Sequence, residues 1–198
     1  MKRTLLILLF LSITLVSNAQ KDKLDNKWYS TAEIEFIFPY KYYYSYFVGN
    51  RIIFNDYDNI FSLKSFGAQY TYNYTFFSKL SVGALAGIQA LSEPSNFLMI
   101  KVGGILKYFF VDRDNIFIYT QMAHVFSTNK SQFKKGGNGR LGIGLPIFKR
   151  DGFNITTNVF VEHNSLDLDG AKPIYSIEDE VPTGLVTSSF GISFGVQF

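Results

Sequence analysis

The sequence LVTSSFGISFGVQF, residues 185–198, decides the fold, because its side chains alternate between two chemically different sets. One set is apolar and consists of Phe190, Ile192, Phe194, Val196 and Phe198. The residues between them are small or polar. Successive side chains of a β-strand point to opposite faces, so a period of two predicts a strand with one apolar and one polar face.

The same alternation recurs along the chain, with turn-forming residues between the segments. Earlier segments with this pattern are 28–38, 61–76, 79–91, 97–110, 139–148 and 153–165. A further segment, 116–127, is apolar on both faces near its start, and this leaves its facing undecided. Together with the terminal stretch, these segments predict an all-β chain of about eight strands.

The amino-terminal residues have the features of an export signal. Lys2 and Arg3 precede an apolar run over residues 5–16, and Ser17 and Ala19 are small residues suited to cleavage. This pattern predicts a cleavable signal peptide over 1–19 and a single domain over 20–198. No later segment approaches about twenty uninterrupted apolar residues, so a membrane-embedded chain would have to span as strands.

Composition excludes several kinds of chemistry. The chain has no Cys, which excludes disulfides, a thiol nucleophile and a thiolate metal site. The net charge of +3 includes Lys2 and Arg3, so +1 remains without them, and nucleic acid is not expected as a partner. The 2 His residues are not at metal-binding spacing. We therefore expect no metal and no cofactor.

The polar faces favour a barrel interior over a solvated surface. They carry mainly Gly, Ser, Thr and Asn with a few charges of both signs, whereas a solvated face usually carries dense Lys and Glu. Aromatic residues gather near the segment ends, as in a membrane-interface girdle. These are Trp28, Tyr72, Tyr74, Phe76, Tyr108, Phe110, Phe153 and Phe198. The alternative is a secreted soluble β-barrel that binds a small ligand.

Connection lengths also follow the pattern of a transmembrane barrel. Short connections at 77–78, 111–115 and 149–152 alternate with longer ones. The longer ones are 39–60, 128–138 and 166–184, and 92–96 is a short exception among them. Outer-membrane barrels have short periplasmic turns and longer external loops, so both termini are expected in the periplasm.

These features together resemble the small outer-membrane barrels of OmpA/OmpX type. The resemblance rests on the signal, the alternating strands, the Gly-rich polar face and the terminal Phe198. It implies an antiparallel up-and-down transmembrane β-barrel in the outer membrane of a Gram-negative-type cell. It further implies a monomer that contacts outer-membrane lipids and lipopolysaccharide, and that the barrel-insertion machinery recognises by its terminal strand.

Charged residues on the polar faces are expected to pair inside the barrel. They are Glu33, Glu35, Lys101, Lys107, Arg140 and Glu162. An eight-stranded barrel is just wide enough for its own side chains, and isolated buried charges are costly. We therefore predict an ion-pair network in a closed lumen, and a non-enzymatic protein whose external loops serve surface interaction or envelope integrity.

One short motif supports a different, enzymatic hypothesis. His163-Asn-Ser165 places an imidazole and a hydroxyl on the same face of a strand, the face directed toward lipid. This resembles the His-x-Ser-Asn motif of lipid A deacylases of PagL type, and implies an ester hydrolase with His163 as base, Ser165 as nucleophile and Glu178 or Glu180 as the acidic partner. The chain departs from the motif at Leu166, and Glu178 and Glu180 lie in a long connection.

Overall fold

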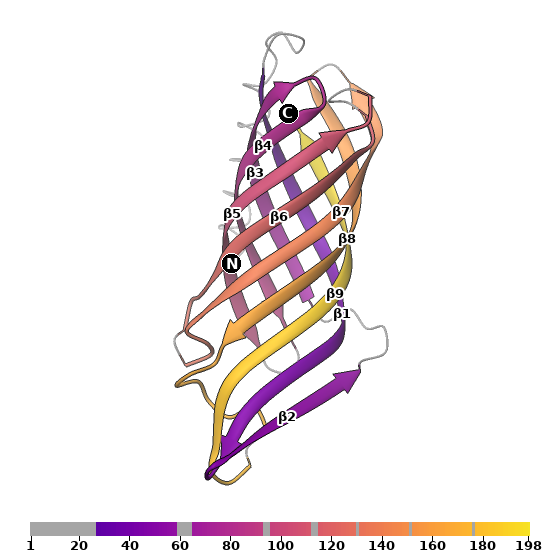
Figure 1. Ribbon diagram of the computed structural model, residues 1–198. Helices are drawn as coiled ribbons and strands as arrows, with labels where there is room; N and C mark the ends of the chain where they lie inside the picture. Colours follow the sequence, from indigo (N-terminus) through magenta and orange to yellow (C-terminus); the bar gives the residue numbers. More distant parts are fainter. Residues whose placement is uncertain are drawn as a thin grey trace, which may run out of the picture.

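Nine antiparallel β-strands make up the described part of the chain (Figure 1). The computed structural model describes residues 27–58, 65–92, 96–111, 115–129, 131–150, 152–175 and 177–198. The strands are β1 (Trp28–Val48), β2 (Arg51–Asp58), β3 (Ser65–Phe77), β4 (Leu80–Leu91), β5 (Phe97–Phe109), β6 (Phe117–Ser127), β7 (Lys135–Arg150), β8 (Phe153–Asp167) and β9 (Glu180–Gln197). The predicted signal peptide, 1–19, lies outside the described residues. Within these ranges no helix is long and apolar enough to cross a membrane.

The sheet closes on itself. Strands β1 and β3 to β9 pair with their neighbours in order, and β9 pairs back onto β1, for example at Ile34 opposite Phe194. The result is a closed antiparallel barrel of eight strands, with β2 as an additional strand beside β1 (Figure 1). The prediction of an all-β barrel of about eight strands is confirmed.

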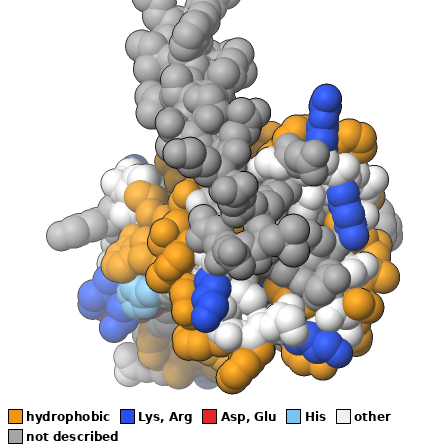
Figure 2. All heavy atoms as spheres, turned by 90° about the horizontal axis from the view of Figure 1, so that it is seen from above, with side chains coloured by type: hydrophobic (Ala, Val, Ile, Leu, Met, Phe, Trp, Pro, Cys, Tyr) orange, Lys and Arg blue, Asp and Glu red, His pale blue; other side chains and the backbone are white. Residues whose placement is uncertain are grey.

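The outer face of the barrel is apolar and the inner face is largely polar. On the outer face Leu141 is 59% exposed and Val161 is 54% exposed, whereas Gln69 and Ser193 on the inner face are buried. On β9, Ile192 and Phe194 are exposed and Phe190, Val196 and Phe198 are partly exposed on the same outer side. Viewed from above, orange hydrophobic side chains surround the barrel and blue basic side chains lie at its rim (Figure 2).

Strand β6, whose facing the sequence left undecided, now has a defined inner side. Phe117, Tyr119 and Val125 are buried inside the barrel, while Met122 and His124 are exposed on the outer wall. Both faces are apolar because the inner one packs into a hydrophobic cluster and the outer one belongs to the apolar belt.

The predicted loop 39–60 is largely strand, which corrects the sequence-based boundary. β1 continues to Val48 and turns through Gly49, whose φ is 58°, into β2. A bulge between Pro39 and Lys41 in the pairing with β9 shifts the alternation by one residue. As a result, aromatic side chains predicted to lie in a loop are buried inside. They are Tyr42, Tyr44 and Tyr46.

Two other predicted loops are shorter than expected. β7 begins at Lys135, and its Gly136 and Gly137 pair with β6 on one side and β8 on the other. β9 begins at Glu180, which pairs with Val48 of β1. Residues that signal loops in the sequence are thus held in strands, the two glycines by pairing with both neighbouring strands and Glu180 by pairing with β1.

Two apolar clusters lie inside the barrel among inward polar side chains. At the end with the β1–β2 hairpin, a cluster we call the hairpin-end cluster consists of Tyr42, Tyr44, Tyr46, Leu91, Phe97, Met99, Val125, Phe133, Leu166, Leu168 and Leu185. A second cluster, which we call the terminal-end cluster because it lies nearer the termini, consists of Tyr29, Ile37, Ile105, Phe109, Phe117, Tyr119 and Phe160. Inner glycines leave room for these rings, since a Cβ on Gly142 would lie 2.6 Å from Tyr119.

Candidate functional site

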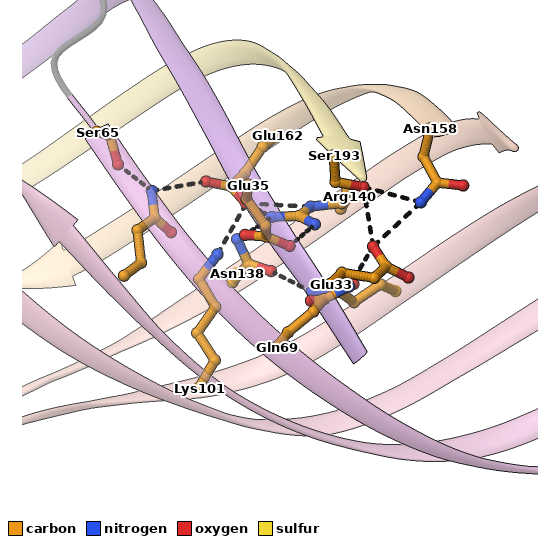
Figure 3. Close-up of polar contacts among 12 residues, drawn as sticks. Glu33, Glu35, Ser65, Gln69, Lys101, Asn138, Arg140, Asn158, Glu162 and Ser193 are labelled. Atoms are coloured by element: carbon orange, nitrogen blue, oxygen red, sulfur yellow. Dashed lines mark hydrogen bonds and ion pairs between the residues drawn. The ribbon is translucent and has the colours of Figure 1, made fainter. Parts of the chain in front are cut away.

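A buried cluster of four charged side chains crosses the middle of the barrel, and Arg140 of β7 lies at its centre (Figure 3). The Arg140 Nη2 donates to Glu35 Oε2 at 2.8 Å and to Glu162 Oε2 at 2.6 Å, and its Nη1 donates to Glu35 Oε1. Lys101 Nζ lies 2.8 Å from Glu162 Oε2. The guanidinium carbon is 3.8 Å from the centre of the Phe160 ring. We call these four charged residues the ionic cluster.

Amide side chains complete the hydrogen bonding of Glu162. Its Oε1 accepts from Gln89 Nε2 at 3.1 Å and from Asn164 Nδ2 at 2.8 Å. Gln89 in turn donates to Ser65 Oγ at 2.8 Å, and Asn138 donates to Asn164 Oδ1 at 2.8 Å. A carboxylate bonded to two cations and two amides is stable in a buried site, because its charge is compensated on every side.

Glu33 lies in a second polar group instead of in the ionic cluster. Its Oε2 accepts from Ser193 Oγ at 2.9 Å, from Asn158 Nδ2 at 3.1 Å and from Gln69 Nε2 at 3.3 Å (Figure 3). These donors come from β9, β8 and β3, so one carboxylate links three strands around β1.

Lys107 lies in a third place, between aromatic rings of the terminal-end cluster. Its Nζ donates to Thr31 Oγ1 at 3.4 Å, and it lies 5.3 Å from the centre of the Tyr29 ring and 5.5 Å from that of Phe117. The six residues predicted as one network are therefore all buried inside the barrel, but four of them are in direct contact and two stand apart.

Sequence reasoning missed the amide and hydroxyl partners of these charges. Gln69, Gln89, Asn158, Asn164 and Ser193 all occupy inward positions of their strands. The period-two alternation of the sequence shows that these side chains point into the barrel. Their bonding partners depend on strand register: Arg140 lies directly opposite Glu162 in the β7–β8 pair, while Glu35 reaches it from β1.

At the end of the barrel with the β1–β2 hairpin, a buried carboxylate holds the β8–β9 connection over the barrel mouth. Glu180 accepts hydrogen bonds from the backbone N–H groups of Ile174 at 3.0 Å, Tyr175 at 3.2 Å and Ile177 at 3.1 Å, and from the Tyr44 hydroxyl. Burial raises the pKa of this carboxyl, but the hydrogen bonds outweigh burial and hold the pKa of Glu180 below its usual value. The same burial and the nearby carboxylate raise the pKa of Tyr44.

Phe133 closes the mouth from the β6–β7 connection. Its side chain is fully buried and lies edge-on to Phe97, with ring centres 6.0 Å apart. The backbone N–H of Lys134 donates to the carbonyl of Asp167 at 2.8 Å, and that of Lys172 donates to Ser131 at 3.0 Å. The two connections therefore support each other across the mouth.

The residues of the enzymatic hypothesis lie on the outside of the barrel. His163 and Ser165 are exposed on the outer wall of β8, and Glu178 is exposed in the connection before β9. His163 Nδ1 is within 3.1 Å of Ser188 Oγ, its direct neighbour on β9. The structure thus pairs the imidazole with Ser188, a hydroxyl the motif did not include. Among the described residues, no three His, Asp or Glu side chains are grouped so that they could hold a metal ion.

No protein-family model matches the chain, and no curated protein matches it in sequence. Its fold is similar to three solved structures of outer-membrane proteins. The solid-state NMR structure of outer membrane protein AlkL in DMPC bilayers is 14% identical, with 90% of this chain and 92% of that chain covered and a TM-score of 0.48. OprG from Pseudomonas aeruginosa is 12% identical, with 86% and 95% covered and a TM-score of 0.44. Neisserial surface protein A is 11% identical, with 85% and 96% covered and a TM-score of 0.42.

Proposed function

We propose that this chain is an integral outer-membrane β-barrel with a closed interior, and that it acts through its external loops and not as a pore or an enzyme. One observation supports this most strongly: the barrel exposes apolar side chains on its outer wall and buries charged side chains inside, the reverse of a soluble protein. Met122 is 75% exposed on the outer wall, whereas Lys101 and Arg140 are buried inside. A soluble protein rarely exposes a continuous apolar surface of this extent, because water would disfavour it.

The height of the apolar belt fits a bilayer. On β9, outward apolar side chains run from Phe190 to Phe198, and on β5 they run from Leu98 to Tyr108. Tilted strands of about ten residues span the roughly 25 Å apolar band of outer-membrane barrels. At the end that carries Phe198, the rings of Trp28 and Tyr72 stack with centres 4.9 Å apart, as expected of an interfacial girdle.

The proposed orientation places both termini of the chain in the periplasm. The turn between β3 and β4 contains only Ser78 and Lys79, while the opposite end carries the β1–β2 hairpin and the β8–β9 connection. Short periplasmic turns and longer external segments are the usual arrangement of such barrels. The external segments are then the part available to partners outside the cell.

Cell fractionation combined with surface proteolysis tests this proposal. We expect the chain in the outer-membrane fraction, with cleavage by external protease in the β1–β2 hairpin and no loss of a tag placed after Phe198 until the membrane is opened. Recovery in the soluble fraction would reject the membrane barrel in favour of the secreted soluble alternative. Protection of the hairpin together with cleavage of the tag would reject the orientation.

A further inference from the structure

A row of three polar side chains crosses the outer wall where the apolar belt ends. His163 of β8 lies directly opposite Ser188 of β9, and Ser188 lies directly opposite Lys41 of β1. The row is already connected on one side, since His163 Nδ1 and Ser188 Oγ are 3.1 Å apart. All three side chains are at least partly exposed, so they are accessible from outside the barrel.

The next row toward the middle of the barrel is entirely apolar. It consists of Val161, Phe190 and Phe38, and the two rings stack with centres 5.1 Å apart and an interplanar angle of 7°. The outer wall thus changes from apolar to polar at this row, and the next row toward the hairpin, Ser165, Val186 and Tyr43, is mixed.

The polar row also lies at the height of lipid headgroups. Along β1, Lys41 comes thirteen positions after the girdle residue Trp28. At a rise of about 3.4 Å per residue and a tilt of about 45°, this distance corresponds to about 30 Å along the membrane normal, the thickness of the hydrocarbon core. Lys41 therefore lies beside the headgroups of the external leaflet.

A hollow of 380 Å³ opens on the external side of this row. Its lining includes Tyr43, Ser45, Phe54, Ser165 and Gly184. The neighbouring wall of β7 is bare, because Gly137 and Gly139 have open space where a Cβ would stand. A group bound at the polar row therefore has room above it and beside it.

The chemistry of the row suits a phosphate. Lys41 lies over the Tyr43 ring at 4.7 Å and pairs with Asp56 at 3.2 Å, and these contacts raise its pKa, so it remains a cation. An ammonium has three N–H donors, and the single contact with Asp56 leaves others for a ligand. His163 and Ser188 are bonded to each other, so with a neutral imidazole the pair leaves one N–H or O–H donor for a ligand. A phosphate offers several strong acceptor oxygens to this donor and to the ammonium.

We propose that His163, Ser188 and Lys41 bind the phosphate of a lipid in the external leaflet. The acyl chains of that lipid lie along Val161, Phe190 and Phe38, and the rest of the headgroup enters the hollow beside Tyr43. This inference rests on the proposed function, because it requires the outer wall to face lipid.

Lipid binding to the purified barrel tests this inference. In micelles of an uncharged alkyl glycoside, native mass spectrometry would follow titration with dioleoyl phosphatidic acid, with dioleoylglycerol, which has the same chains without phosphate, and with inorganic phosphate. We expect one tightly bound phosphatidic acid, and a loss of affinity of about tenfold in Lys41→Gln and in His163→Gln, the effect of one charge-assisted hydrogen bond. Lys149→Gln is the matched control, because Lys149 lies near the end of β7, far from the polar row. This variant should bind phosphatidic acid as the wild type does.

Two results would overturn the inference. One is that dioleoylglycerol or free phosphate binds as tightly as phosphatidic acid. The other is that Lys41→Gln and Lys149→Gln bind phosphatidic acid with the same affinity. Unchanged heat-modifiable gel mobility would establish that each variant is folded. Failure here is distinguishable from failure of the proposed function, because the cellular location of the chain is determined separately by fractionation.

Discussion

Arg140 donates to both Glu35 and Glu162, so a change at this residue leaves two buried carboxylates with less compensation. Lys101 would still pair with Glu162, but Glu35 would lose its only ion pair among the described residues. We predict that Arg140→Met lowers the free energy of unfolding by about 3–5 kcal/mol, the cost of breaking a buried ion pair. Urea unfolding in micelles measures it, with Lys149→Met as the exposed control. A loss no larger than that of the control would contradict the prediction.

Glu180 gives the β8–β9 connection a dependence on pH. Because its pKa is lowered in the folded protein, its ionised form stabilises the fold above the ordinary Glu value of about 4.3, and this contribution is lost as the pH falls through the lowered value. We predict that the amides of Ile174, Tyr175 and Ile177 exchange slowly near neutral pH and become unprotected in acid.

Hydrogen exchange at several pH values measures this effect. Glu180→Gln should show weak protection that does not change with pH. Glu178→Gln, an exposed change in the same connection, should behave as the wild type does. Protection that persists unchanged in Glu180→Gln would show that the carboxylate does not order the connection.

At the scale of elements, inward and outward glycines should respond differently to the same change. A Cβ on Gly103 would overlap the backbone of Met122 and Ala123 in β6, whereas a Cβ on Gly139 would meet nothing within 4 Å. We predict that Gly103→Ala destabilises the barrel by about 1–3 kcal/mol, because the backbones of β5 and β6 must separate. Gly139→Ala should stay within about 0.5 kcal/mol of the wild type. Equal unfolding midpoints for both variants would refute this account of the wall.

Strand patterns were predictable wherever the two faces differ in chemistry. β3 alternates Phe66, Ala68 and Tyr70 with Gly67 and Gln69, and its facing follows directly from that pattern. The half of β1 nearer the β1–β2 hairpin could not be predicted in this way, because its residues are aromatic on both faces. The bulge after Pro39 that turns Tyr42, Tyr44 and Tyr46 inward depends on pairing with a strand distant in sequence.

The candidate site was predictable in its members and not in its contacts. Alternation identifies Arg140 and Glu162 as inward residues, but only the register shows that they are direct neighbours. Lys101 and Glu35 reach this pair from β5 and β1, and those contacts depend on the diameter and stagger of the closed barrel. Single strands do not encode these quantities.

For the whole molecule, the buried interior side chains predict that the barrel does not conduct. The hairpin-end cluster, the ionic cluster and the terminal-end cluster place buried side chains in succession along the interior. We predict no stable large conductance in planar-bilayer recordings of the wild type. The Phe133→Ala barrel should also show no stable large conductance, because the change removes only one ring from the hairpin-end cluster. Porin-like steps in the wild type would contradict a filled interior.

The pairing of β1 with β9 also constrains the order of folding. Ile34 and Phe194 are neighbours in space, yet almost the entire barrel lies between them in the chain. The ribosome makes β9 after every other strand. The edge of β1 that pairs with β9 therefore has no partner while the chain is being made. An unpaired, aromatic edge of this kind favours aggregation and slow folding. Closure must therefore follow the synthesis of β9, and the yield of closed barrel depends on how long this edge of β1 stays unpaired.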